Sequence, residues 1–152
     1  MMVKYTHDKA IGEPVNQHHI RLIIKYLFGH YGALFYGHMK TIIAGSRDNV
    51  GPEHLFEAFD IIDYEITQVI CGCARGADTI GKAWADLEGI PCLEMPADWD
   101  LHGKKAGSIR NEEMALEAEA LIALWDGVST GTANMINIAE RLGLHVTVIY
   151  TQ

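Results

Sequence analysis

Three arginines in this sequence lie beside glycines, a setting that suits the capture of phosphate or carboxylate groups. Arg47, Arg75 and Arg110 each stand within three residues of a glycine. A guanidinium group is planar and donates two parallel hydrogen bonds to such an anion, and a glycine lets the backbone approach a ligand closely. Each arginine alone is more simply explained as half of a surface ion pair. Together they predict an anion pocket.

A loop rich in glycine and hydroxyl groups offers a second part of such a pocket. Residues 126–132 read Asp-Gly-Val-Ser-Thr-Gly-Thr, after the apolar run 120–125 and before the helical pattern 133–142. The loop is therefore expected to join a strand to the N-terminus of a helix, where free N–H groups and the positive end of the helix dipole bind anions. The alternative is an ordinary turn in which a threonine caps the helix.

The same loop also satisfies the Gly-x-Ser-x-Gly pattern of the nucleophile elbow in α/β-hydrolases. In that architecture an acid and then a histidine follow the serine, which here would be Ser129. The candidates are Glu140, inside a helical pattern, and His145, at the start of a strand. Neither position suits a catalytic triad, and the chain is short for that fold. A phosphate-binding serine is the preferred interpretation.

Apolar runs alternate with amphipathic helical patterns from Met39 onward. Such alternation predicts the α/β class, here a three-layer Rossmann-like sandwich with a mostly parallel five-stranded sheet. The polar segment 96–107 is expected to be a long loop. Ligands of such sheets bind beyond the carboxyl ends of the strands, where the strand order reverses, and the glycine-rich segments follow those ends. The expected strands are 41–44, 69–71, 91–95, 120–125 and 145–150, and the expected helices are 52–62, 77–88, 109–118 and 133–142.

Composition restricts the classes of partner. The net charge of −8 disfavours binding to nucleic acid or to anionic membranes, because a protein binds both through the summed positive potential of its own surface. The three cysteines lack the spacing of a zinc site, so no metal site is predicted. No cofactor is predicted either. No signal-peptide pattern and no apolar run of about 20 residues is present, so a cytoplasmic protein without a membrane partner is expected.

The first 38 residues differ from the rest and are predicted to form an N-terminal extension, with the main domain at 39–152. They hold four Lys/Arg against two Asp/Glu and five of the eight histidines. A helix is expected within residues 15–28, because apolar residues recur there with helical spacing. Its stripe must be buried against the main domain or a second copy, which predicts a homo-oligomer. The stripe consists of Ile20, Ile23, Ile24, Leu27 and Phe28.

Five segments in order carry a family resemblance that covers residues 40–150. The chain resembles the YspA-type (cpYpsA-related) branch of the SLOG superfamily, Rossmann-like proteins grouped with the Lonely-guy enzymes and DNA-processing protein A. The resemblance implies a nucleotide or nucleotide-derived ligand at the strand ends, with its phosphate on residues 127–132 and its sugar or base beside residues 45–48. The segments are 44–48, 72–78, 96–99, 107–114 and 127–132.

Lonely-guy enzymes cleave the N-glycosidic bond of nucleoside monophosphates, and their loop ends in a catalytic glutamate. The corresponding position here is Met135, which carries neither charge nor proton, whereas Arg110 matches the family's arginine and is the one catalytic candidate. Binding or sensing of a nucleotide is therefore preferred over a phosphoribohydrolase-like N-glycosidase. Single-stranded nucleic-acid binding is a third alternative. Carboxylates that might replace the glutamate are Asp48, Asp78, Asp98 and Glu113.

The residues predicted to contact the ligand come from all five segments. Trp99 is expected to stack on a base or cover the pocket, or to pack under its loop. Asp78 is expected to bind ribose hydroxyls or pair with Arg75, and Asn111 to contact a base edge or cap a helix. The full set is Gly45, Ser46, Arg47, Asp48, Gly72, Ala74, Arg75, Gly76, Asp78, Trp99, Arg110, Asn111, Gly127, Ser129, Thr130, Gly131 and Thr132.

Overall fold

The protein is described by a computed structural model that covers residues 3–5 and 37–152. Its centre is a sheet with the strand order β1-β6-β5-β2-β3-β4, in which every neighbouring pair is parallel. The predicted five-stranded sheet is confirmed by β2 to β6, and β1 adds a sixth strand at the edge beside β6. The strands are β1 Val3–Tyr5, β2 His38–Gly45, β3 Glu65–Cys71, β4 Cys92–Glu94, β5 Ala120–Trp125 and β6 His145–Tyr150.

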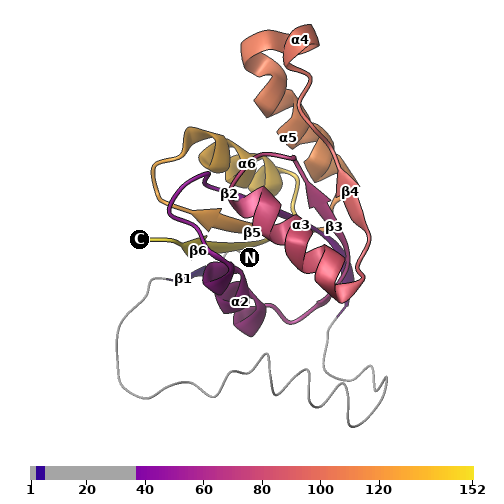
Figure 1. Ribbon diagram of the computed structural model, residues 1–152, viewed down its shortest axis with the longest axis vertical. Helices are drawn as coiled ribbons and strands as arrows, with labels where there is room; N and C mark the ends of the chain where they lie inside the picture. Colours follow the sequence, from indigo (N-terminus) through magenta and orange to yellow (C-terminus); the bar gives the residue numbers. More distant parts are fainter. Residues whose placement is uncertain (1–2, 6–36) are drawn as a thin grey trace.

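Helices cover both faces of this sheet, which makes three layers (Figure 1). Alternate residues of one strand enter opposite cores: Ile43 of β2 packs with α2 and α3, whereas Ile42 packs with α5 and α6. Burial on both faces explains why the central strands are apolar throughout. The helices are α2 Pro52–Ile61, α3 Ala77–Glu88, α4 Trp99–His102, the 3₁₀ turn η1 Gly103–Lys105, α5 Ala106–Glu117 and α6 Thr130–Arg141.

Two helices, α5 and α6, begin three residues earlier than expected from the sequence. Helix α6 begins at Thr130 rather than at residue 133, because the side chain of Ser129 accepts a hydrogen bond from the Thr132 amide and so caps the helix. The predicted threonine cap is therefore wrong. The expected loop 96–107 contains α4 and η1, and α5 follows them without a break. The Asp98 side chain starts α4 by accepting from the Leu101 amide.

Strand order reverses between β2 and β5. From β2 the chain adds β3 and β4 on one side, then returns to place β5 and β6 on the other. The carboxyl ends of β2 and β5 lie side by side, with Gly45 opposite Leu124 and the Ser46 amide donating to the Leu124 carbonyl at 2.8 Å. The loops that follow these ends diverge and leave a crevice, the usual ligand position in open parallel sheets.

The predicted helix within residues 15–28 lies outside the described residues. Within the part of the chain that the structure describes, no helix is both long and apolar enough to span a bilayer. The same part contains no group of three or more His, Cys, Asp or Glu side chains arranged to hold a metal ion.

Candidate functional site

A cavity of about 740 Å³ opens at the strand-order reversal, between the ends of β2 and β5 and the facing helices α5 and α6. Most of the predicted ligand-binding residues line it. These are Gly45, Arg47, Ala74, Asp78, Trp99, Arg110, Asn111, Ser129, Thr130, Gly131 and Thr132. The structure thus brings together segments that are more than 80 residues apart in the sequence.

Among the residues that the structure describes, three cations face this cavity, in a chain whose net charge is −8. They are Arg47 after β2, Lys104 of η1 and Arg110 of α5. Two carboxylates, Asp78 and Asp126, share the lining. The local balance is therefore positive within a negative molecule, which favours an anionic ligand that is captured at short range.

Arg110 is held in place by the loop after β3. Its Nη1 donates to the Gly72 carbonyl, and its Nε donates to Asn111 Oδ1 at 3.2 Å. A Cβ at position 72 would collide with this guanidinium group. Gly72 therefore supports the site without lining the cavity, because its lack of a side chain leaves the space that Arg110 occupies.

Asp78 holds the same loop from the first turn of α3. Its Oδ2 accepts from the amides of Gly72 at 2.9 Å and Ala74 at 3.2 Å, and the residue is 4% exposed. Burial raises the pKa of the Asp78 carboxyl, and the two backbone hydrogen bonds and the Arg110 charge oppose that rise. The predicted pairing of Asp78 with Arg75 is wrong, because the backbone amides are its partners.

The loop between β5 and α6 carries its own internal bracing. Asp126 Oδ1 accepts from the amides of Val128 at 2.9 Å and Ser129 at 2.7 Å, and these bonds lower the pKa of Asp126. The Asp126 amide donates to Ser46 Oγ at 2.9 Å, and the indole Nε1 of Trp125 donates to the Ser129 carbonyl at 3.1 Å. Ser46 is buried and acts here as a brace rather than as a lining residue.

The bracing leaves the start of α6 open to the cavity. Thr130 and Gly131 are the first two residues of the helix, so their amides have no acceptor within it. A Cβ added at Gly131 would find no atom within 4 Å. The space in front of these amides is therefore available to an anionic group.

A chain of amide and hydroxyl groups connects α5 with α6 along the cavity wall. Asn111 Nδ2 donates to Asn134 Oδ1 at 2.9 Å, and Asn134 Nδ2 lies 3.4 Å from Ser108 Oγ. Asn111 is buried within α5, so the prediction that it caps the helix is wrong. Ser108 and Asn134 line the cavity beside it and supply polar atoms at the wall.

Arg75 departs from the predicted group of three arginines. Its Nη2 lies 3.1 Å from Asp48 Oδ2, and both side chains are mostly exposed, at 70% and 69%. Neither residue lines the cavity. The predicted site residues Gly76 and Gly127 also lie outside the lining. Gly76 allows close approach of its loop to the backbone of residues 46–47, where a Cβ would collide.

Met135 lies at the cavity floor and also belongs to the core beneath it, at 1% exposure. It therefore brings no ionisable group to the position that carries the glutamate in Lonely-guy enzymes. Of the carboxylates considered as replacements, Asp78 lines the cavity and the other three do not. Asp98 instead caps α4.

Several lining residues were not predicted from the sequence. Asn134 stands one helical turn after Thr130, so the helical period could have identified it. Lys104 lies in the segment that was expected to be a loop, and nothing local indicates that it turns toward the cavity. The lining residues outside the predicted list of contacts are Ala44, Lys104, Gly107, Ser108, Met114, Asp126, Val128, Asn134 and Met135.

The fold and the cavity define a Rossmann-like protein with a crevice at the reversal of strand order. Residues 39–102 match the YspA, cpYpsA-related SLOG family, and the chain belongs to that family. The match runs from β2 through α4 and so includes Arg47, Asp78 and Trp99. Membership suggests a nucleotide-related role.

The chain is also similar to the Gene 61 protein of Mycobacterium phage D29. The two are 42% identical over 85 residues, which cover 51% of this chain and 67% of the phage protein. The name of that relative states no activity. The chemistry of the site must therefore be argued from the residues of the cavity.

Proposed function

We propose that this protein binds a nucleotide or nucleotide-derived small molecule in the cavity. The observation that carries the proposal is that Arg47, Arg110 and the open N-terminus of α6 line one cavity at the reversal of strand order. The guanidinium groups and the helix amides are complementary to phosphate oxygens. The anionic group of the ligand lies between them.

The dimensions of the cavity agree with this proposal. Its volume of about 740 Å³ falls within the range of roughly 300–1,000 Å³ that is common for small-molecule sites. The wall that Ser108, Asn111 and Asn134 form offers polar atoms beyond the anion position. A ligand larger than a lone phosphate, with further groups that form hydrogen bonds, fits such a site.

A pair of variants at Gly131 tests the anion position. Gly131→Asp places a carboxylate in front of the α6 amides, where it repels a phosphate, whereas Gly131→Ala adds only a methyl group to open space. For the wild type with a nucleotide at a hundredfold excess over Kd, we expect Tm to rise by about 5 to 10 °C. The rise is expected in the alanine variant and lost in the aspartate variant.

Thermal unfolding is measured with AMP, GMP, CMP, UMP and NAD, each with and without the variants. The apo Tm of both variants serves as the control for folding, since a Cβ at position 131 lies in open space. An aspartate variant that is stabilised as strongly as the wild type contradicts the anion assignment.

Hydrolysis of the ligand is a second candidate, which Asp78 favours. This lining carboxyl has a raised pKa and lies near Arg110, and a protonated carboxyl can donate a proton to a departing base. Incubation with nucleoside monophosphates, followed by chromatography for free base, tests it. Base release that Arg110→Ala abolishes would establish the N-glycosidase, and no release leaves the binding role.

A further inference from the structure

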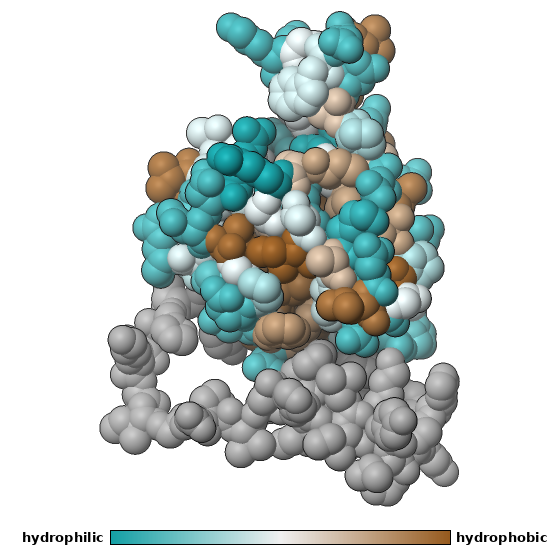
Figure 2. Space-filling model, viewed as in Figure 1, coloured by the Kyte–Doolittle hydropathy of each residue, from teal (hydrophilic) through white to brown (hydrophobic). Residues whose placement is uncertain are grey.

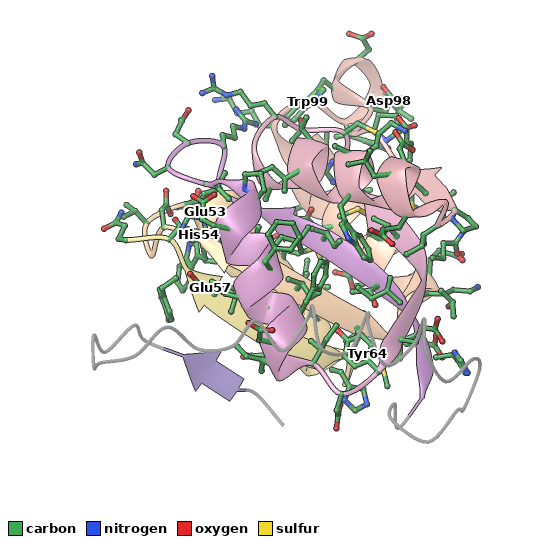
Figure 3. The ribbon with its side chains drawn as sticks, turned by 60° about the horizontal axis from the view of Figure 1, so that its bottom comes forward. Glu53, His54, Glu57, Tyr64, Asp98 and Trp99 are labelled. Carbon is green, nitrogen blue, oxygen red and sulfur yellow. The ribbon has the colours of Figure 1, made fainter. Side chains whose placement is uncertain are left out.

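Trp99 is an exposed aromatic residue at the wall of the cavity. It begins α4, is 55% exposed, and lines the cavity together with Lys104 of η1. In Figure 3, Trp99 and Asp98 lie at the far end of the molecule from Tyr64, which precedes β3 and so marks the amino-terminal side of the sheet. Trp99 therefore belongs to the carboxyl side, where the cavity opens.

The segment Trp99–Lys105, here called the α4–η1 arm, is supported by little of the protein. Figure 1 shows α4 projecting beyond the layers of the sandwich, and no residue of α4 or η1 is buried. On the face shown in Figure 2 the projecting end carries mostly hydrophilic side chains. The arm nevertheless brings one indole ring and one ammonium group to the cavity.

The indole ring is held close to helix α5. A Cβ added at Gly107 would lie 3.6 Å from Trp99 Cη2, so the ring rests near the helix backbone at the cavity wall. Ser108 follows directly, and its hydroxyl lies 3.4 Å from Asn134 Nδ2. An apolar ring surface thus adjoins a polar pair, which suits a flat heterocycle with hydrogen-bonding edges.

We infer that the ligand carries a planar aromatic group that stacks on Trp99 while its anionic group occupies the α6 end of the cavity. This inference rests on the proposed function and adds the identity of the second subsite, a nucleobase-type ring. Lys104, on the same arm, lines the same cavity. Stacking covers apolar indole surface that is otherwise in water, which stabilises the complex.

The test compares a nucleotide with the same compound without its base. AMP and ribose 5-phosphate are titrated by calorimetry into the wild type, Trp99→Ala and Trp99→Phe. We expect Trp99→Ala to weaken AMP by between about 5-fold and about 150-fold, the usual range for loss of one base stack, and to leave ribose 5-phosphate unchanged. Trp99→Phe is expected to retain most of the AMP affinity.

Leu101→Ala is the matched control, because Leu101 is 71% exposed on the same arm and does not line the cavity. AMP is also expected to quench tryptophan fluorescence in the wild type and in this control, and to quench it less in Trp99→Phe, where Trp125 remains beside the Ser129 loop. Quenching of equal size in Trp99→Phe and in the wild type argues against contact with Trp99.

The outcomes separate this inference from the function on which it rests. If AMP binds, Gly131→Asp abolishes binding and Trp99→Ala leaves the affinity unchanged, then the stacking inference is wrong and the nucleotide site stands. If Trp99→Ala weakens AMP and ribose 5-phosphate equally, Trp99 shapes the cavity and does not bind a base. If neither compound nor any mononucleotide binds the wild type, both proposals fall.

Discussion

Asp78 stabilises a loop through hydrogen bonds, but its burial also destabilises its charged form. It accepts two backbone hydrogen bonds that hold the 72–74 loop, yet burial raises its pKa. The folded state therefore binds a proton at higher pH than the unfolded chain does. By linkage, the stability that this group contributes falls as pH rises from about 3.8 through its raised pKa.

Asp78→Asn should remove this pH dependence. Relative to the asparagine variant, the wild type is expected to lose free energy of unfolding as pH rises above about 3.8 and through the raised pKa, because only the wild type then comes to bury a charge. Urea unfolding at several pH values measures the difference. Asp48→Asn, at a carboxylate that is 69% exposed, provides the control. A wild-type curve parallel to that of Asp78→Asn would contradict the raised pKa.

At the scale of the element, two glycines at helix ends, one at α3 and one at α6, both have room for a side chain but differ in backbone conformation. Gly89 caps the C-terminus of α3 with a φ of 69°, and Gly131 is the second residue of α6, outside the left-handed region; neither would bring a Cβ within 4 Å of another atom. Gly89 is therefore required by backbone conformation alone. The backbone conformation of α6 does not require a glycine at position 131, which agrees with the proposed close approach of a ligand there.

Alanine at each position separates these roles. We expect Gly89→Ala to lower the free energy of unfolding by about 1 to 2 kcal/mol, because an alanine is strained at this φ. Gly131→Ala should leave it unchanged or raise it by up to about 1 kcal/mol, because alanine favours the helix. Urea denaturation measures both. A loss at Gly131 as large as that at Gly89 would show that α6 needs this glycine for its own geometry.

At the scale of the whole molecule, the strand order decides where along the carboxyl ends of the strands a ligand can bind. The loops after β2 and β5 diverge at the reversal, and α5 and α6 complete the cavity above them. The amino-terminal ends of the strands, on the opposite side of the molecule, follow turns such as residues 62–64 and 142–144. Binding is therefore expected to change only one end of the molecule.

Hydrogen exchange with and without AMP tests this polarity. Saturating AMP is expected to slow amide exchange in residues 45–48, 107–111 and 126–132, since these segments surround the cavity. The turns at 62–64 and 142–144 provide internal controls and should exchange at unchanged rates. Slowing at those turns, with none at 126–132, would place the ligand elsewhere.

The sequence by itself determined the alternation of apolar strands and amphipathic helices, and with it the parallel sheet and the edge where glycine-rich loops gather. Those features are local: they follow from periodicity and from residues such as Gly45 and Gly131 that open the backbone. The five-stranded sheet, the 126–132 loop and the arginines at 47 and 110 could therefore be predicted from local patterns, and the family resemblance supplied the other predicted lining residues.

Only the tertiary structure decided which charges face the cavity. Arg75 pairs with Asp48, 27 residues away, while Lys104 reaches the lining because α4 and η1 form where a loop was expected. The direction of a long side chain depends on partners that folding brings from distant segments, and no local pattern encodes those distances. For the same reason the sequence could predict an anion pocket with arginines in its lining, but it could not predict Lys104 as the third cation.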